Sequence, residues 1–388
     1  MIGSFDCWPK RVIVGAGAIS DIADMIKEMG RKSVLIFTGP HLATMPVIKG
    51  LVEQIEKAGL RAGVFSDLGA NPTVEMAEKA VEYMNDFQPE ALVCFGGGSP
   101  IDTGKAANVV FTHGGTPVDY DVAAGGIMKI QPRLLPMIIV PTTAGSGTEV
   151  TNVGVLTNEE KQTKFGILSP YLIPDISILD PEVTVSMSPR LTANTGIDAL
   201  THCIEAYTSS VDFAPGDAIA LEGIRLIGKS LRAAVKNGAD LDARENMLVA
   251  SMMGGTAFSL NGLGACHAMA HQLSAFFDMA HGEANAILLP VVMEYNLEAK
   301  QERFAKIAEA LGADISKMTE KEAAEKALEM VKKLSEDVNI PKYLDDAGAT
   351  KEAIPGMVER ALLDNPLTTN PRPAGAKEIE ALYLKAFR

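Results

Sequence analysis

The chain has 388 residues, of which 47% are hydrophobic, and its 35 Lys and Arg against 49 Asp and Glu give a net charge of −14. This length allows two or three domains, and the composition supplies apolar side chains for sizeable cores. An acidic surface repels phosphate backbones and anionic lipid headgroups, so the charge argues against nucleic-acid and membrane partners. No apolar run approaches the roughly 20 residues of a membrane helix.

The N-terminal sequence and the number of cysteines predict the cellular compartment of the protein. MIGSFDCWPKRV has no cationic segment followed by an apolar core, so no signal peptide is expected. Four scattered cysteines do not form a disulfide framework, and we expect a reducing cytoplasm. Cys203 and Cys266 each adjoin a histidine, but adjacent helical residues point about 100° apart. We therefore expect buried structural thiols.

Strands and helices alternate through residues 1–185. The patterns predict strands at 12–17, 33–39, 61–69, 91–98 and 134–143, and helices at 22–29, 47–58 and 74–87. Because the strands are nearly continuous apolar runs, they predict a parallel sheet covered on both faces. We expect a Rossmann-like α/β domain that binds a nucleotide.

Helical patterns dominate residues 186–388. Ser188 and Pro189 read as an N-cap and a first helical position. Helices are predicted at 189–209, 216–236, 242–260, 263–277 and 284–299, with shorter ones beyond. The second domain is therefore expected to be all-helical, with Lys317–Glu336 as a solvated, charge-rich helical face.

A glycine loop, GGGSPID, follows the strand at 91–98. Ligands of parallel sheets bind beyond the carboxyl ends of strands, and glycines let a phosphate approach the backbone. Ser99 is predicted to cap the next helix, with Asp102 completing a capping box. A well-capped turn without a ligand is the alternative. PTTAGSGTEVT (141–151) and Lys164 offer further phosphate or nicotinamide contacts, or a plain polar loop and a surface lysine.

Two other glycine motifs do not fit nucleotide binding. Gly15 and Gly17 begin a dinucleotide fingerprint, but Ser20 replaces its third glycine. Gly104-Lys105 resembles the end of a phosphate-binding P-loop, but Ala106 stands where Ser or Thr is needed. We therefore reject an ATPase.

Four of the six histidines lie between residues 198 and 281. Asp198 precedes His202 by four residues, and His267 precedes His271 by four. Residues four apart share a helix face, about 6 Å apart along the axis. One carboxylate and three imidazoles suit a divalent first-row metal that polarises a substrate oxygen, and the set is Asp198, His202, His267 and His281. For any single histidine, a hydrogen-bonded core residue is the alternative.

HAMAH (267–271) also has the histidine spacing of a zinc-protease helix. Ala268 stands where that reaction needs a glutamate, so the protease hypothesis fails.

Four blocks together resemble the signatures of the iron-containing (group III) alcohol dehydrogenases. The blocks are GGGSPIDTGKA, PTTAGSGTEVT, TGIDALTHCIEAY and CHAMAHQLSAFFDMAHGEANAILLP. The resemblance extends from PKRVIVGAGA to TNPRPA. It implies the architecture that this family shares with dehydroquinate synthase, with a site in the cleft between an α/β and a helical domain.

The resemblance also implies roles for individual residues. The implied metal ligands are Asp198, His202, His267 and His281. Contacts to NAD(H) or NADP(H) are implied for Asn71, Gly97, Gly98, Ser99, Asp102, Thr142, Thr143, Ser146 and Lys164. Phe258 matches an aromatic wall of the substrate pocket, and His271 a histidine near the nicotinamide that is not a usual ligand.

Family members strict for NAD often carry an aspartate where Gly39 stands. Its absence removes the repulsion of a 2′-phosphate, so NADP(H) stays open beside the favoured NAD(H). The family expectation for the metal is Fe(II), and the ligand set also accepts Zn(II) or another divalent ion. The family forms homodimers and higher homo-oligomers.

The expected activity is reversible hydride transfer between a small alcohol and its aldehyde. His271 is the candidate proton relay, and a purely orienting role is its alternative. A specialised reductase of lactaldehyde, a semialdehyde or a sulfonated or phosphonated aldehyde is a second hypothesis. A metal-dependent lyase of the dehydroquinate synthase type is a third.

Overall fold

The computed structural model describes residues 8–161 and 163–388. The chain divides into two compact units, which we call the sheet unit and the helical unit. The sheet unit contains the described residues up to Thr143 together with Thr148–Val185, and the helical unit contains Ala144–Gly147 and Ser186–Arg388. A tetrapeptide from the first half of the chain therefore groups with the second half.

The sheet unit is built on six parallel strands in the order β1-β8-β5-β4-β2-β3. Their bounds are Arg11–Val14, Ile176–Leu179, Met137–Pro141, Ala91–Gly96, Ser33–Phe37 and Arg61–Phe65, in that order. Every residue of β2, β4, β5 and β8 is buried, as the continuous apolar runs of β2, β4 and β5 predict. β8, in the segment ISIL, was not predicted as a strand.

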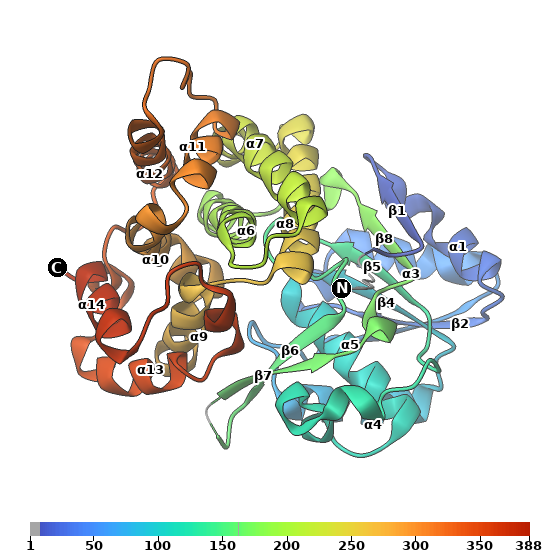
Figure 1. Ribbon diagram of the computed structural model, residues 1–388. Coiled ribbons are helices and arrows are strands. Elements are labelled where there is room, and N and C mark those ends of the chain that lie inside the picture. Colours follow the sequence, from blue (N-terminus) through green and yellow to red (C-terminus); the bar gives the residue numbers. More distant parts are fainter. Residues whose placement is uncertain (1–7, 162) are drawn as a thin grey trace. The chain divides into compact units, whose positions relative to one another are not determined.

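Helices cover both faces of this sheet (Figure 1). Side chains alternate along each strand, so Val34 and Ile36 of β2 join one apolar core while Leu35 and Phe37 join the other. The first core includes α1 (Ile22–Glu28) and α3 (Pro46–Lys57), and the second includes α4 (Val74–Phe87) and α5 (Gly98–His113). A short helix, α2 (Pro40–Ala43), follows β2.

An antiparallel hairpin in the sheet unit was not predicted. It consists of β6 (Val153–Asn158) and β7 (Thr163–Leu168), and it lies beside α5 in Figure 1. Every second residue of β6 is buried, because one face of this strand packs on Ala106, Val109 and their neighbours.

The helical unit consists of helices α6 to α14. Their bounds are Pro189–Thr208, Ala214–Lys236, Leu241–Asn261, Ala265–Phe277, His281–Asn296, Gln301–Ala310, Glu320–Asp337, Ile354–Ala361 and Ala376–Ala386. The predicted fold class, a Rossmann-like α/β unit followed by helices, is confirmed. The charge-rich α12 is solvated on one face only, because Val331 and Leu334 are buried.

Several helix starts differ from prediction, and two of them bear on the candidate site. The predicted capping box of α5 is wrong: the helix begins at Gly98 after an N-cap at Gly97, so Ser99 falls in the first turn and its hydroxyl donates instead to the Gly69 carbonyl, at 2.7 Å. α10 begins at His281 and not at 284, after α9 ends in a left-handed Asp278. The N-cap at Ser188 is confirmed by its bond from the Leu191 amide.

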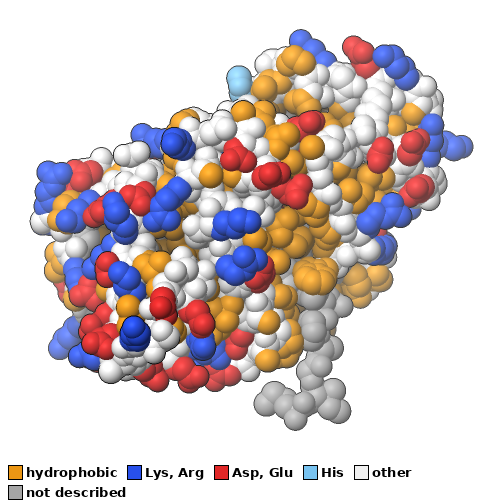
Figure 2. Space-filling model, turned by 90° about the horizontal axis from the view of Figure 1, so that it is seen from above, with side chains coloured by type: hydrophobic (Ala, Val, Ile, Leu, Met, Phe, Trp, Pro, Cys, Tyr) orange, Lys and Arg blue, Asp and Glu red, His pale blue; other side chains and the backbone are white. Residues whose placement is uncertain are grey.

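Cysteine placement agrees with structural thiols, because Cys94, Cys203 and Cys266 are buried and free, while Cys7 lies outside the described residues. Basic and acidic side chains are interspersed on the face that Figure 2 shows, which is not the one-sign field of a nucleic-acid surface. Among the described helices, none is both long and apolar enough to cross a membrane.

Candidate functional site

Four predicted metal ligands converge inside the helical unit. α6 presents Asp198 and His202 one turn apart, α9 presents His267, and α10 presents His281 from its first position. One ligand atom from each of the four lies within 4.8 Å of the other three. Asp198 Oδ1 lies 3.9 Å from His267 Nε2 and 3.8 Å from His281 Nε2. The i,i+4 spacing and the packing of three helices thus bring the set to one point.

Close packing of small residues allows this convergence. A Cβ on Gly282 would lie 2.7 Å from the Asn194 carbonyl oxygen, so glycine lets α10 begin against α6. A Cβ on Gly254 of α8 would lie 3.1 Å from Cβ of His202. Larger side chains at these two positions would force α10 and α8 away from α6.

Carboxylate and carbonyl acceptors fix the orientation of two imidazoles. Nδ1 of His267 lies 2.6 Å from Glu205 Oε2, and Nδ1 of His202 lies 3.1 Å from the Gly145 carbonyl oxygen. Because both partners only accept, each Nδ1 carries the proton and each Nε2 keeps its lone pair. Glu205 is itself held by the Cys266 amide, which donates to Oε1 at 2.7 Å.

The donor set fits a divalent cation. Nε2 of His267 is buried and has no hydrogen-bond partner among the described residues, although a buried polar atom is costly to leave unpaired. Burial lowers the pKa of His202 to about 4, against the raising effect of Asp198, so its imidazole is neutral at pH 7. A neutral imidazole is the form that binds metal. Asn285 Nδ2 donates to Asp198 Oδ1 at 2.8 Å and lies 3.1 Å from His281 Nε2, so this side chain contacts both proposed ligands.

His271 lies beside this set but outside it. Its ring stacks on His281 with centroids 5.3 Å apart, and its Nδ1 lies 2.8 Å from Asp364 Oδ2. The carboxylate accepts a hydrogen bond from Nδ1–H, which leaves the lone pair on Nε2. Asp364 also accepts from Gln272 at 3.1 Å. His271 is thus an oriented, partly exposed imidazole next to the candidate metal centre.

Phe258, the predicted substrate wall, is on α8. Its ring centroid lies 4.8 Å from that of His202, and it is only half-buried. An aromatic face with remaining exposure beside a proposed ligand is suited to contact an apolar part of a substrate.

The predicted dinucleotide contacts of the sheet unit gather beyond the ends of β4 and β5. The Thr142 amide donates to the Gly96 carbonyl at 2.9 Å, and a Cβ on Gly97 would lie 3.2 Å from Thr143 Oγ1. No side chain of the described residues caps α5, so the first amides of this helix suit an anion.

Two more predicted contacts are linked to this group. Asn71 lies on the loop whose Gly69 accepts from Ser99 and whose Pro72 accepts from the Thr157 amide, at 2.8 Å. Thr157 pairs across the hairpin with Lys164. Ser146 differs from the others, because it belongs to the tetrapeptide that groups with the helical unit.

Asp102 is engaged within the protein. Its Oδ1 accepts from Thr148 Oγ1 at 2.7 Å and its Oδ2 from the Val155 amide at 3.3 Å. A direct dinucleotide contact by Asp102 stays a prediction.

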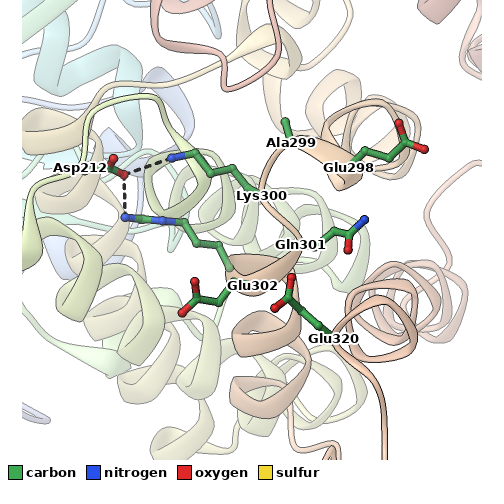
Figure 3. Close-up of a pocket in the computed structure, with 8 residues that line it drawn as sticks. Asp212, Glu298, Ala299, Lys300, Gln301, Glu302 and Glu320 are labelled. Atoms are coloured by element: carbon green, nitrogen blue, oxygen red, sulfur yellow. Dashed lines mark hydrogen bonds and ion pairs between the residues drawn. The ribbon is translucent and has the colours of Figure 1, made fainter.

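A polar pocket of about 590 Å³ lies elsewhere in the helical unit (Figure 3). Lys300 points toward Asp212 at 3.1 Å, and Arg303 contacts the same carboxylate at 2.8 Å. The two cations of the pocket are thus already paired, and none of the predicted site residues lines it.

Three side chains that contact the candidate site residues escaped prediction, namely Glu205, Asn285 and Asp364. Glu205 could have been found, because it lies three residues after His202 and seven after Asp198 on the same helix face. Asn285 likewise lies four residues after His281. Asp364 is 93 residues from His271 and carries no local signal.

Comparison with known proteins identifies the class. A family model described as iron-containing alcohol dehydrogenase matches residues 9–181, and one described as the C-terminal part of the Fe-containing alcohol dehydrogenase family matches residues 192–387. The chain belongs to the iron-containing alcohol dehydrogenase family. It is an oxidoreductase that interconverts alcohols and aldehydes, and its family membership implies use of a metal and of NAD(H).

Individual relatives match over the full chain. The chain is 40% identical over 381 residues to 1,3-propanediol dehydrogenase of Klebsiella pneumoniae, covering 98% of this chain and 97% of the relative. It is 37% identical over 374 residues to lactaldehyde reductase of Escherichia coli K12, covering 96% and 97%. A solved 1,3-propanediol oxidoreductase superimposes with a TM-score of 0.96 at 39% identity, covering 100% of both chains.

Proposed function

We propose that this enzyme uses Fe(II), held by the four residues at the helical convergence, and NAD(H) to interconvert a small alcohol and its aldehyde. The observation that carries the proposal is the convergence of Asp198 with three imidazoles, of which only His281 is partly exposed. Glu205 and Gly145 set the Nε2 lone pairs of the other two imidazoles. Zn(II) or another divalent ion suits the same donors.

A divalent cation held by Asp198, His202, His267 and His281 would supply Lewis-acid stabilisation of the negative charge that develops on a substrate oxygen. The chain's residues set the conditions for that chemistry. Glu205 holds His267, the Gly145 carbonyl holds His202, and Asn285 holds Asp198 beside His281. Phe258 supplies an apolar surface next to these polar groups, which orients the carbon side of a substrate and excludes water there.

His271 is proposed to exchange the alcohol proton with solvent. Asp364 keeps the Nδ1 proton in place, so the proton is accepted and released at Nε2. The remaining exposure of the imidazole gives it a path to water. An orienting role for His271 is the alternative, and it predicts no change of the pH–rate profile when the imidazole is removed.

The dinucleotide is proposed to bind at the sheet unit. Its pyrophosphate would face the first amides of α5 at Gly97, Gly98 and Ser99. Further contacts are proposed for Asn71, Asp102, Thr142, Thr143, Ser146 and Lys164. At Gly39, a Cβ would meet nothing within 4 Å, so this position leaves room for the adenosine ribose or its 2′-phosphate. NAD(H) is favoured because no arginine adjoins Gly39 in the sequence.

A three-carbon diol or hydroxyaldehyde is the proposed substrate class. Support comes from two relatives of about equal identity, one named for 1,3-propanediol and the other for lactaldehyde. A semialdehyde or a sulfonated or phosphonated aldehyde is the second candidate within the same activity. The protein is further proposed to be a homodimer or higher homo-oligomer in the cytoplasm, which agrees with its three described cysteines being free thiols.

The test is a screen of aldehydes with NADH and with NADPH, on protein purified without oxygen and analysed for metals. Oxidation of NADH with lactaldehyde or 3-hydroxypropanal in the iron-loaded protein is the expected result. Metal-loaded protein that oxidises neither dinucleotide with any aldehyde would overturn the proposal, and a lyase reaction on a sugar phosphate would then be assayed.

A further inference from the structure

The lysine of the Gly104-Lys105 pair faces inward. Its side chain is 0% exposed, although the pair resembles the end of a phosphate-binding loop. Its Nζ lies 2.8 Å from the carbonyl oxygen of Thr148, 2.8 Å from that of Thr151 and 2.9 Å from that of Val153. Three carbonyls thus match the three N–H donors of the ammonium.

Other contacts hold the same stretch of chain. The hydroxyls of Thr148 and Thr151 each lie 3.2 Å from Nζ, and Asp102 accepts from Thr148 Oγ1 and from the Val155 amide. A Cβ on Gly154 would lie 3.4 Å from Cβ of Lys105, so β6 passes close over α5. Residues 148–155 are therefore fastened to α5 by an ammonium, a carboxylate and a close backbone approach.

The contacts between α5 and residues 148–155 join segments that carry, or lead to, proposed dinucleotide contacts. α5 begins at the glycine loop with Gly98 and Ser99. Residues 148–155 follow Thr142 and Thr143 in the chain and lead into the hairpin on which Lys164 pairs with Thr157. Lys105 thus anchors α5 to the stretch that leads into the hairpin, although its own side chain is fully buried.

We propose that Lys105 is a positioning residue for the dinucleotide, because its ammonium holds residues 148–155 and the β6–β7 hairpin in register with the start of α5. The inference rests on the proposed function. Burial lowers the pKa of Lys105 to about 8 while Asp102 raises it, so the ammonium persists at neutral pH. Removing it takes the charged donor away from the carbonyls of Thr148, Thr151 and Val153, so this segment loses the group that holds it to α5 and must rearrange.

The test is Lys105→Met in the full-length, metal-loaded enzyme. Calorimetric titration with NADH and with NADPH, without substrate, gives the dissociation constants, and hydrogen-exchange mass spectrometry follows residues 148–155. We expect faster hydrogen exchange in residues 148–155. We also expect the dissociation constant to rise roughly tenfold or more, because dinucleotide binding must then order the freed loop residues. Metal content and the KM for aldehyde at saturating dinucleotide should stay at the wild-type values.

Arg244→Met is the matched control. Arg244 is another buried cation, 2% exposed, that donates to Thr192 Oγ1 at 2.8 Å and to the Gly238 carbonyl at 3.0 Å within the helical unit. Its loss should lower the melting temperature and leave dinucleotide affinity unchanged. A general loss of stability is thereby separated from a loss of positioning.

Thr148→Val is the milder variant for the case in which Lys105→Met does not fold. It removes one hydroxyl contact to Nζ and the bond to Asp102, and it should give faster exchange of residues 148–155 with weaker dinucleotide binding. A folded Lys105→Met, or failing that Thr148→Val, with wild-type exchange and affinity overturns the inference. Wild-type protein that binds neither dinucleotide would instead contradict the proposed function.

Discussion

Glu205 accepts a hydrogen bond of 2.6 Å from Nδ1 of His267, and both side chains are buried. Glu205 lies one helix turn after His202, and its other carboxylate oxygen accepts a hydrogen bond from the Cys266 amide. It therefore decides which nitrogen of His267 faces the candidate metal position.

Replacing Glu205 with Gln should weaken metal binding about 10- to 100-fold, the usual effect of losing a partner that orients a ligand. Competition with a chromophoric chelator measures the affinity. Lys164→Met, which changes a proposed dinucleotide contact on β7 of the sheet unit, is the control and should bind metal normally. Wild-type affinity in Glu205→Gln would show that the carboxylate has no part in holding the ion.

Removing the metal should lower the melting temperature by several degrees. The proposed ligands belong to α6, α9 and α10, and an ion that binds only the folded state at a thousandfold excess over its dissociation constant adds about 4 kcal/mol. Calorimetric scans with and without a chelator measure the shift. In His267→Ala the chelator should hardly change the melting temperature. A wild-type melting temperature that the chelator does not shift would contradict a metal bound by these four residues.

His271→Ala should lower kcat by about 100-fold or more, the usual range for loss of a general acid–base, while metal content stays normal. Added imidazole should restore part of the rate. The pH–rate profile should also lose one limb. If rate and profile both equal those of the wild type, His271 neither relays a proton nor orients its neighbours in a way that matters for turnover.

Gly39→Asp should fold normally, because its Cβ has open space. A carboxylate there would repel a 2′-phosphate and accept from a ribose hydroxyl. We expect the ratio of kcat/KM for NADPH to that for NADH to fall by about 10- to 100-fold, which corresponds to about 1.4 to 2.8 kcal/mol. Gly39→Asn, which is similar in size and uncharged, is the control. An unchanged ratio would show that the ribose does not reach this position.

Glu149 should make stability depend on pH. It is 1% exposed, and burial raises its pKa from the ordinary 4.5 to about 7, with Lys105 opposing. Between these two values the folded state binds more protons than the unfolded state, so this group's contribution to stability is lost as pH rises from about 4.5 to 7. Relative to wild type, Glu149→Gln should gain up to about 3 kcal/mol between pH 4.5 and pH 8. Urea titrations of both proteins at several pH values test this, and a constant difference would contradict it.

The strands and the shared ligand faces could be predicted because each depends on residues close together in the sequence. Apolar runs such as 91–98 determine buried strands, and i,i+4 pairs determine which ligands share a helix face. The hairpin of β6 and β7 was missed because its burial comes from packing on α5, and α5 is some 50 residues earlier in the chain. Asp364 was missed for a related reason, since only the tertiary fold brings it to His271.

The tetrapeptide Ala144–Gly147 limits how this protein can be divided or recombined. The chain leaves the sheet unit at Thr143 and returns to it at Thr148, and in between it supplies the carbonyl that orients His202. Gly147 lies against Gly255 so closely that a Cβ there would be 2.5 Å from its Cα. A helical fragment that starts at residue 186 would lack a piece of its own interior. Chimaeras between relatives should therefore exchange residues 144–147 together with the second half, although they belong to the first half in sequence.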